Sequence, residues 1–228
     1  MIDMKAAGPR LRSAAEALGV KFDTGVQEKL LQYVNQLARW NKTYNLTAIR
    51  DPDTMLVNHL FDSLAVIPPI TEILYKNTVS EHSNVEPIVV DVGSGAGLPG
   101  AVLALCGIGQ IHCVDAVQKK VTFIRQMAGQ LQCPELIAHH QRIEQMPSLN
   151  ADIVISRAFS SLTDFVRLSG HHAGKHGVLV AMKGHEPKEE IESLHDETDW
   201  RVSQLIDLSV PELEANRCLL VLKPKDRQ

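Results

Sequence analysis

A run of four glycines is the stretch of this sequence best suited to chemistry. An apolar, β-branched segment, residues 88–92, leads into Gly93, Gly95, Gly97 and Gly100, and an apolar helical stretch follows. Strand, glycine loop and helix is the layout of a nucleotide-type binding turn. Glycine lets the backbone approach a ligand closely, and a helix N-terminus presents unpaired N–H groups. A turn without a ligand is the alternative, and it is disfavoured because a bare turn rarely needs four glycines.

The acid at the end of this strand, Asp91, narrows the choice of ligand. The dinucleotide spacing G-x-G-x-x-G fits only from Gly95, which is two residues late, and no Lys-Ser or Lys-Thr follows as in a phosphate loop. The pattern Asp-x-Gly-x-Gly-x-Gly fits better. A carboxylate at this place would repel a pyrophosphate but would suit an amino group and a sulfonium. The sequence therefore predicts a site for S-adenosyl-L-methionine (SAM).

A second acid, Asp115, ends the next expected strand, residues 111–114. An acid about 20 residues after a glycine loop can hydrogen-bond a ribose diol. NAD and SAM share that ribose, so Asp91 is what separates them. The alternative for Asp115 is an N-cap of the helix expected to begin near Gln118, and the two roles are compatible.

Composition excludes several classes of protein. The 228 residues, 44% of them hydrophobic, suit one domain, with or without an extension. With no run of 18 apolar residues and no apolar core in residues 1–11, we expect a cytoplasmic protein without a membrane span. The four cysteines lack metal-ligand spacing and adjacent histidines do not face each other on a helix, so we expect no metal. The net charge of −4 disfavours indiscriminate nucleic-acid binding but allows a local basic face.

Apolar spacing predicts helices before the glycine loop and an alternating pattern after it. The expected helices span 9–18, 24–40 with Thr24 as its cap, 52–67 and 70–75, before a polar connection at 77–86. From residue 88 onward strands alternate with helices, which predicts an α/β sheet with right-handed crossovers; its strands are expected at 88–92, 111–114, 135–138, 151–155, 177–182, 202–208 and 218–222. Ligands of such sheets bind beyond the carboxyl ends of the strands, where we expect Asp91, Asp115, Ile143, Glu144 and Arg157 to converge.

Two stretches leave structural and functional interpretations open. Residues 39–47 interleave aromatic and basic side chains, as a surface for single-stranded RNA does. They equally suit a helix C-terminus anchored by Trp40 and Tyr44. His59, Asp62 and Ser63 lie on or beside an apolar helix face, where a buried hydrogen-bond network is favoured over a catalytic role.

Taken together, the motifs resemble the 16S rRNA guanine-N7 methyltransferase family, RsmG, also called glucose-inhibited division protein B. The matching stretches are residues 39–47 (RWNKTYNLT), 59–63 (HLFDS), 91–100 (DVGSGAGLPG), 156–159 (SRAF) and 183–184 (KG). They show no departure at the motif positions, and only the polar connection after Tyr75 looks expanded. The glycine loop alone would indicate only a methyltransferase, whereas the full set is specific to the family.

The resemblance implies transfer of a methyl group from SAM to N7 of guanine 527 of 16S rRNA in the small ribosomal subunit. It implies a Rossmann-like class I methyltransferase fold, with a seven-stranded, mostly parallel sheet and helices on both faces. An N-terminal helical extension (1–78) and a methyltransferase domain (79–228) would pack as one globular unit. The family's cofactor contacts map to Gly93, Leu98, Ile143, Glu144 and Arg157; to these the cofactor chemistry above adds Asp91, Gly95, Gly97 and Asp115.

Guanine N7 carries an in-plane lone pair and no proton, so positioning alone can align it with the methyl carbon and the sulfonium. No residue is therefore certain as a catalytic group. The candidate is Arg157, serving both cofactor and RNA phosphate, with a structural salt bridge as its alternative. Residues 156–159 do not match an amine-methylation motif, and no cysteine lies there for pyrimidine C5 chemistry. The candidates for RNA contact are Arg39, Trp40, Lys42, Tyr44, Lys119, Lys120, Arg125, Lys183 and the basic tail from Lys223.

Two other classes of function remain open at this point: a binding module that retains a cofactor pocket, and a SAM-dependent methyltransferase acting on another RNA or on a small molecule. The acidic net charge favours the small molecule, whereas the aromatic and basic residues 40–44 disfavour it. We expect a monomer. We also expect a protein-bound rRNA substrate, since phosphate neutralisation drives much of the affinity for bare RNA.

Overall fold

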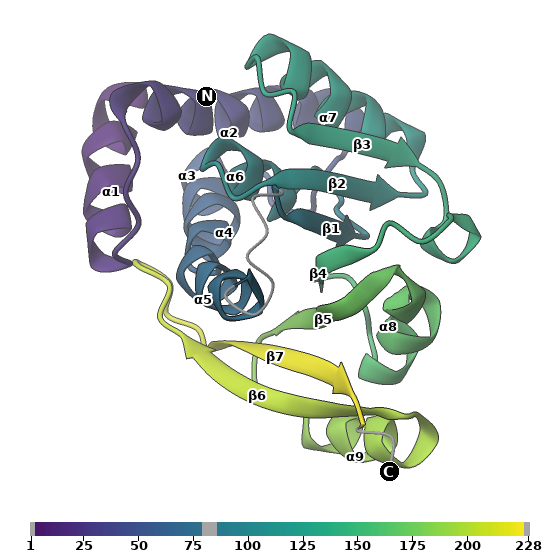
Figure 1. Cartoon of the computed structure of the whole chain (residues 1–228). Helices are drawn as coiled ribbons and strands as arrows, with labels where there is room; N and C mark the ends of the chain where they lie inside the picture. Colours follow the sequence, from purple (N-terminus) through teal and green to yellow (C-terminus); the bar gives the residue numbers. More distant parts are fainter. Residues whose placement is uncertain (1–2, 79–85, 226–228) are drawn as a thin grey trace.

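The computed structural model describes residues 3–78 and 86–225, and the first of these ranges is helical (Figure 1). Most of the polar connection at 77–86 and the end of the basic tail lie outside the described residues. The N-terminal helices are α1 (Met4–Ala17), α2 (Thr24–Tyr44), α3 (Pro52–Met55), a π-helix (Leu56–Phe61), α4 (Asp62–Leu64) and α5 (Ile67–Thr78).

The ends of these helices differ from the prediction because of their caps. The Asp3 carboxylate accepts hydrogen bonds from the backbone N–H groups of Lys5 and Ala6, so α1 begins well before Pro9. Asp23, not Thr24, caps α2, which continues past Trp40 to Tyr44. The helix predicted from residue 52 does begin there, at Pro52 of α3, and the side chain of Asp51 caps it by accepting from Thr54 N at 2.7 Å.

The strands and helices then alternate as predicted. The strands are β1 (Ile88–Val92), β2 (Gln110–Asp115), β3 (Leu136–His140), β4 (Ala151–Ser156), β5 (Ala173–Lys183), β6 (Trp200–Leu208) and β7 (Arg217–Pro224). The helices between them are α6 (Gly100–Leu105), α7 (Gln118–Gln130), α8 (Leu162–Ser169) and α9 (Lys188–Glu197), with 3-10 turns at Ile143–Gln145 and Gly170–His172.

The seven strands form one sheet in the order β3-β2-β1-β4-β5-β7-β6, in which β7 runs antiparallel to both of its neighbours. The predicted mostly parallel, seven-stranded sheet is therefore confirmed. β1 pairs with β2 on one side and β4 on the other. The strand order reverses at this point, which in open α/β sheets is where a ligand binds.

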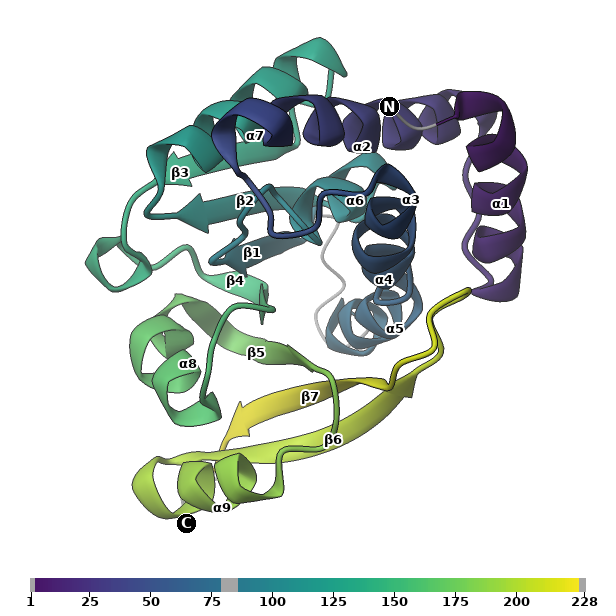
Figure 2. The same ribbon diagram turned by 180° about the vertical axis from the view of Figure 1, so that it is seen from behind.

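Helices cover both faces of the sheet, and successive strand residues point into different cores. Val89 and Ile153 join a core with α2, α6 and α7, whereas Val90 and Val154 join one with α8 and α9. Figures 1 and 2 both show α2 lying beside α7, with α6 between α2 and the sheet. The N-terminal helices and the sheet thus share one continuous core.

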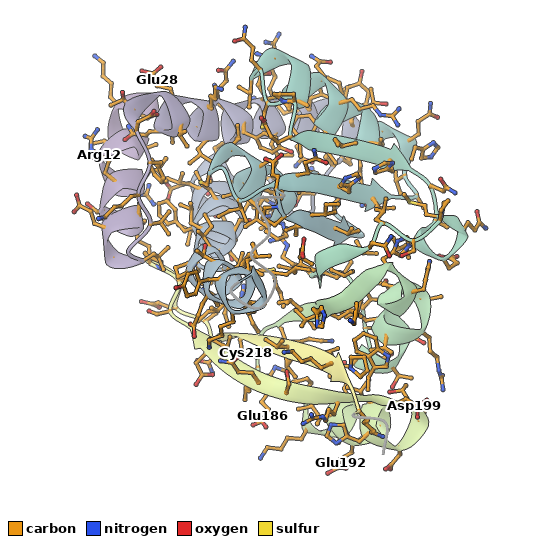
Figure 3. All side chains as sticks on the ribbon, in the orientation of Figure 1. Arg12, Glu28, Glu186, Glu192, Asp199 and Cys218 are labelled. Carbon is orange, nitrogen blue, oxygen red and sulfur yellow. The ribbon has the colours of Figure 1, made fainter. Side chains whose placement is uncertain are left out.

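The outer faces of the helices are polar, as expected for amphipathic helices packed on a core. Figure 3 shows the exposed side chains of Arg12 on α1, Glu28 on α2 and Glu192 on α9 projecting away from the ribbon. Within residues 3–78 and 86–225, no helix combines the length and apolarity needed to cross a membrane.

Candidate functional site

Two adjoining cavities open at the carboxyl ends of β1, β2 and β4. The smaller, about 260 Å³, is lined by residues 92–93, 114–116, 141–144, 158–159 and 168. The larger, about 560 Å³, is lined by residues 49, 58–59, 62, 93–95, 98, 157–158, 182–184 and 217. Gly93 and Ala158 line both cavities, which therefore meet at the start of the glycine loop.

The first half of the glycine loop requires glycine for two separate reasons. Gly93 and Gly95 have φ angles of +64° and +60°, a region that other residues rarely adopt. A Cβ atom at Gly93 would also lie 2.6 Å from Cβ of Ala158. A Cβ at Gly95 would meet no described atom within 4 Å. Gly93 thus closes the loop against Ala158, while Gly95 leaves its backbone open to a ligand.

The second half of the loop is held from beneath by α2. Gly97, with φ +80°, leaves no room for a Cβ because the hydroxyl oxygen of Tyr33 would lie 2.5 Å from it. The Tyr33 hydroxyl donates a hydrogen bond to the Ala96 carbonyl at 2.6 Å. Tyr33 is fully buried, and this burial raises the pKa of its hydroxyl. Our sequence analysis did not identify Tyr33 as a site residue.

Asp91 lies under the loop and lines neither cavity. Its Oδ2 accepts a hydrogen bond from Gly100 N, the first residue of α6, at 2.8 Å, and its Oδ1 has no partner among the described residues. Burial raises the pKa of Asp91 to about 7, against the opposing effects of the Gly100 hydrogen bond and of Arg157. The geometry shows a carboxylate that holds the loop to α6, and a direct contact with a cofactor stays a prediction.

Asp115 lines the smaller cavity and ties β2 to the glycine loop. Its Oδ2 accepts from Gly95 N at 2.9 Å and its Oδ1 from Val117 N at 2.8 Å. The N-cap of α7 is Val117, without a side-chain cap bond, so the alternative of Asp115 as the helix N-cap is wrong. Each carboxylate oxygen retains a lone pair, so contact with a ribose remains compatible with this geometry.

Ile143 and Glu144 form the far wall of the smaller cavity from a 3-10 turn. Ile143 is buried, and its carbonyl accepts a hydrogen bond from Nε2 of His172 at 2.9 Å. Glu144 is exposed. His172 is fully buried, and through this hydrogen bond it supports the turn that carries Ile143 and Glu144.

Asp62 organises the larger cavity by binding two arginines. Arg157 Nη1 donates to its Oδ2 at 3.1 Å and Arg217 Nε to its Oδ1 at 2.8 Å. The Asp62 side chain is 3% exposed, and the arginine side chains 27% and 26%. One carboxylate thus balances two guanidinium groups, which leaves a net positive charge beside the cavity. Arg157 is both a salt-bridge partner and a cavity residue; Arg217 was not among our candidates.

A chain of side-chain hydrogen bonds links residues 39–47 to this cavity. Nδ2 of the buried Asn41 donates to the Ile49 carbonyl at 2.9 Å, and its Oδ1 accepts from Thr47 N at 2.8 Å. Thr47 Oγ1 in turn lies 2.9 Å from Nε2 of His59, and Ser63 Oγ donates to the His59 carbonyl. The buried network favoured for His59 and Ser63 is present, and it shapes one wall of the larger cavity.

Comparison with known proteins identifies the family. The family described as rRNA small subunit methyltransferase G matches residues 26–221. The chain belongs to this family. The relative named ribosomal RNA small subunit methyltransferase G in Bordetella petrii is 49% identical over 215 residues, covering 94% of this chain and 82% of the relative. The protein of the same name in Bordetella avium is 50% identical over 219 residues, covering 96% and 94%.

Solved structures support the fold alone. The ribosomal protein L11 methylase of Lactobacillus delbrueckii subsp. bulgaricus is similar with a TM-score of 0.50 and 15% identity, covering 69% of this chain and 79% of that one. The [4+2]-cyclase SpnF is similar with a TM-score of 0.51 and 12% identity, covering 68% and 80%. These two similarities agree with a class I methyltransferase fold for this member of the methyltransferase G family.

The aromatic and basic residues near the end of α2 form the anchored helix C-terminus that was one of the two interpretations left open for this methyltransferase G member. Trp40 is half-buried, with ring centroids 5.1 Å from Tyr44 and 5.5 Å from Phe123 of α7, so it anchors the helix end. Arg39 and Lys42 are exposed, and Tyr44 is 46% exposed. Contact of these residues with RNA stays a prediction.

The remaining basic candidates differ in their partners. Lys119 is exposed, whereas Lys120 Nζ lies 3.7 Å from Oδ2 of Asp115. Arg125 donates to the Ala138 carbonyl. Lys183 Nζ donates to Glu190 and to the Phe159 carbonyl, so it fixes the loop after β4. Its contact with RNA, like that of the other three, stays a prediction.

Proposed function

We propose that this protein transfers the methyl group of SAM to N7 of guanine 527 of 16S rRNA in the small ribosomal subunit. The names of its relatives, ribosomal RNA small subunit methyltransferase G, support an rRNA substrate. The observation that carries the proposal is the pair of cavities meeting at Gly93 and Ala158. One cavity suits a nucleoside and the other offers room for a second molecule beside it.

The residues of the two cavities fit SAM. Asp115, Ile143 and Glu144 would hold the adenosine in the smaller cavity, with acid and backbone groups suited to a ribose and a purine. Gly93, Leu98 and Arg157 would hold the methionine end, where Gly95 leaves the loop backbone accessible. When bound there, SAM supplies an electrophilic methyl group on its sulfonium.

The chain's own contribution is to position the two reactants. Guanine N7 attacks with its lone pair and loses no proton, so no general base is required, and alignment supplies the rate enhancement. Asp62 fixes Arg157 from α4, and Asp91 and Tyr33 fix the loop from below. The helical extension, proposed as residues 1–78, therefore acts with the methyltransferase domain, 79–228, as one unit.

We propose that the enzyme works as a monomer in the cytoplasm and needs its rRNA in a protein-bound form. Its net charge of −4 weakens binding to bare RNA, because neutralisation of phosphates supplies much of that affinity. Equal methylation rates on deproteinised rRNA and on intact subunits would contradict this part, as would a dimer by light scattering.

The test uses small ribosomal subunits from a strain that lacks the endogenous enzyme. The subunits are incubated with the protein and methyl-labelled SAM, and the label is mapped by reduction and aniline cleavage, which breaks RNA at N7-methylguanine. One cleavage, at guanine 527, is expected. Label without cleavage would mean another atom. Absence of label, with cofactor binding shown separately, would favour another RNA, a small molecule or a binding module.

A further inference from the structure

Arg217 is a cavity residue to which the proposed reaction assigns no task. It stands at the start of β7 and lines the larger cavity together with Arg157 and Asp62. Two hydrogen bonds hold its guanidinium: Nε donates to Oδ1 of Asp62 at 2.8 Å, and Nη1 donates to the Asn216 carbonyl at 2.9 Å. Because the Asp62 side chain is only 3% exposed, the interior of the protein sets the orientation of this arginine.

The rest of the Arg217 guanidinium is available to a ligand. A guanidinium has five N–H donors, and the bonds to Asp62 and Asn216 use two of them, so three remain. Within residues 3–78 and 86–225, Nη2 has no hydrogen-bond partner, and it does not belong to the buried polar atoms without a partner. Nη2 therefore reaches the surface, in agreement with the 26% exposure of the Arg217 side chain.

The two arginines leave an excess of positive charge in the larger cavity. Asp62 supplies one carboxylate to the guanidinium groups of Arg157 and Arg217. The ammonium group of Lys183, which lines the same cavity, is paired with Glu190 at 2.8 Å. The remaining charge thus belongs to the two arginines. The ligand that such a pair favours is an anion, because hydrogen bonds between ionised partners are the strong ones.

The two guanidinium groups face different neighbours. Arg157 is followed by Ala158, which lines both the smaller and the larger cavity, so Arg157 adjoins the place where the two meet. Arg217 instead borders a third cavity of about 750 Å³, lined by residues 185–186, 207–210 and 213–218. Arg157 is therefore suited to the carboxylate of the cofactor's methionine. Arg217 is suited to an anion at the end of the larger cavity away from the smaller one.

We propose that Arg217 binds a phosphate group of the rRNA, one of the two that flank the target guanosine, an inference that rests on the proposed function. A guanine in the larger cavity brings these two phosphates with it, since its ribose joins them. Two N–H groups on one edge of a guanidinium match two oxygens of a phosphate. Such a contact fixes the register of the strand without reading the base.

The charges of the third cavity limit the path of the strand. Its lining includes the exposed carboxylates of Glu186, Asp207 and Glu214. A polyanion therefore meets positive charge at Arg217 and negative charge immediately beyond it. This contrast favours a single phosphate contact at Arg217 and directs the rest of the RNA away from the third cavity.

The alternative is that Arg217 only ties β7 to α4 through Asp62. Arg217→Gln removes the charge, whereas Arg217→Lys keeps a charge and loses the paired N–H groups. Arg10→Gln is the matched control, because Arg10 also joins two carboxylates, Asp53 and Glu212, that are far apart in the sequence. Its side chain is 31% exposed, and it lines neither the smaller nor the larger cavity.

The first measurement is the affinity of each variant, loaded with S-adenosyl-L-homocysteine, for small ribosomal subunits over a range of salt concentrations. Arg217→Gln is expected to weaken this affinity about 10-fold and to lower the slope of log affinity against log salt by about 0.7–1. Arg217→Lys should restore the slope but only part of the affinity. Arg10→Gln should stay within about 2-fold of the wild type.

Affinity for S-adenosyl-L-homocysteine itself, measured by calorimetry, distinguishes an RNA phosphate from the cofactor's carboxylate. We expect it to stay within about 2-fold of the wild type in each variant, since Arg217 does not line the smaller cavity. A loss of about 10-fold or more in Arg217→Gln would mean that this arginine binds the cofactor, and would overturn the phosphate contact.

The second measurement tests the phosphate in the wild type. Reconstituted small subunits carry an uncharged methylphosphonate on either the 5′ or the 3′ side of the target guanosine. One of the two should lower kcat/KM about 10-fold, and the same replacement should cost Arg217→Gln little more, because changes to one contact are not additive.

Wild-type rates unchanged by both methylphosphonates, or effects that add to that of Arg217→Gln, would overturn the phosphate contact and leave the proposed function standing. Failure of the wild type to methylate guanine N7 in unmodified subunits would overturn both.

Discussion

The smaller and the larger cavity differ in how widely their lining residues are spread along the sequence. The smaller cavity is lined only by residues between Val92 and Leu168, from consecutive strand–helix units. The larger cavity takes residues from Ile49 to Arg217, so its walls join the N-terminal helices, the glycine loop and the start of β7. Yet the two cavities share Gly93 and Ala158.

This difference matches a division of tasks. Consecutive strand–helix units present their loops at one edge of a parallel sheet, which is enough to bind a nucleoside in many proteins with this fold. We propose that the specific substrate binds where the additional helices reach the sheet, in the larger cavity. Beside the larger cavity, the buried carboxylate of Asp62 joins these helices to Arg157 after β4 and to Arg217 on β7, in addition to the core that the helices share with the sheet.

Substitution of the Asp62 carboxylate is the change with the largest expected effect. It should impair the larger cavity while leaving the smaller one nearly unchanged. Asp62→Asn removes the charge that balances Arg157 and Arg217 and turns an amide N–H toward a guanidinium. Because Asp62 is 3% exposed, we expect the free energy of unfolding to fall by about 3 kcal/mol. Methylation should fall with it, while adenosine binding in the smaller cavity changes little. Urea unfolding and calorimetry with adenosine measure the two effects.

Glu72→Gln is the matched control for this loss of a carboxylate. Glu72 pairs with Lys76 on α5, and the two side chains are 60% and 62% exposed. Its removal is expected to cost at most about 0.5 kcal/mol. Equal effects of Asp62→Asn and Glu72→Gln would mean that the larger cavity does not depend on the buried pair.

The smaller cavity could be predicted from sequence because its signals are local. A β-branched run before glycines, and an acid at the end of the next strand, place Asp115, Ile143 and Glu144 at one edge through the regular geometry of the sheet. All seven strands were predicted for the same reason, although β5 begins at Ala173 rather than at residue 177.

The larger cavity could be predicted only in part, because its contacts are long-range. Arg217 lies 155 positions after Asp62, and a charged residue at the start of a strand carries no local signal. Tyr33 reads as one more apolar position of the α2 stripe, and only the fold reveals its bond to Ala96. The position of Asp91 under the loop also depends on packing: the spacing indicated an acid beside the ligand but not which surface it faces.

The shared residue Gly93 offers the next test, since its substitution should affect both cavities at once. Gly93→Ala combines a φ of +64° with a Cβ 2.6 Å from Cβ of Ala158. We expect a loss of stability of about 2 kcal/mol and a fall in cofactor affinity of about 30-fold or more, measured by calorimetry with S-adenosyl-L-homocysteine. Gly129→Ala in α7, where a Cβ meets no described atom within 4 Å, is the control and should be neutral or slightly stabilising.

Asp91 lies beneath the glycine loop that the two cavities share, and it gives a pH-dependent test of how that loop is held. Its pKa is raised to about 7 in the folded state, so its stability contribution is complete below about pH 4 and is lost as the pH rises through about 7. Asp91→Asn stays neutral, and its amide oxygen can still accept from Gly100 N. At about pH 8 we expect the variant to be more stable than the wild type by roughly 1–3 kcal/mol, with a smaller difference at about pH 5. Chemical denaturation at the two pH values measures this, and a constant difference would contradict the assignment.

Tyr33 provides the smallest and sharpest test of whether the smaller cavity is independent of the N-terminal helices. Tyr33→Phe removes the hydrogen bond to the Ala96 carbonyl and leaves that acceptor buried, at an expected cost of about 1–2 kcal/mol. The edge-to-face contact of the ring with Phe123 is retained. If α2 only supports the fold, stability falls and cofactor affinity does not change. We expect affinity for S-adenosyl-L-homocysteine to fall about 3-fold to 10-fold, since the loop that carries Gly95 loses its support. Such a loss would mean that even the cavity built from consecutive strand–helix units depends on a residue far outside them.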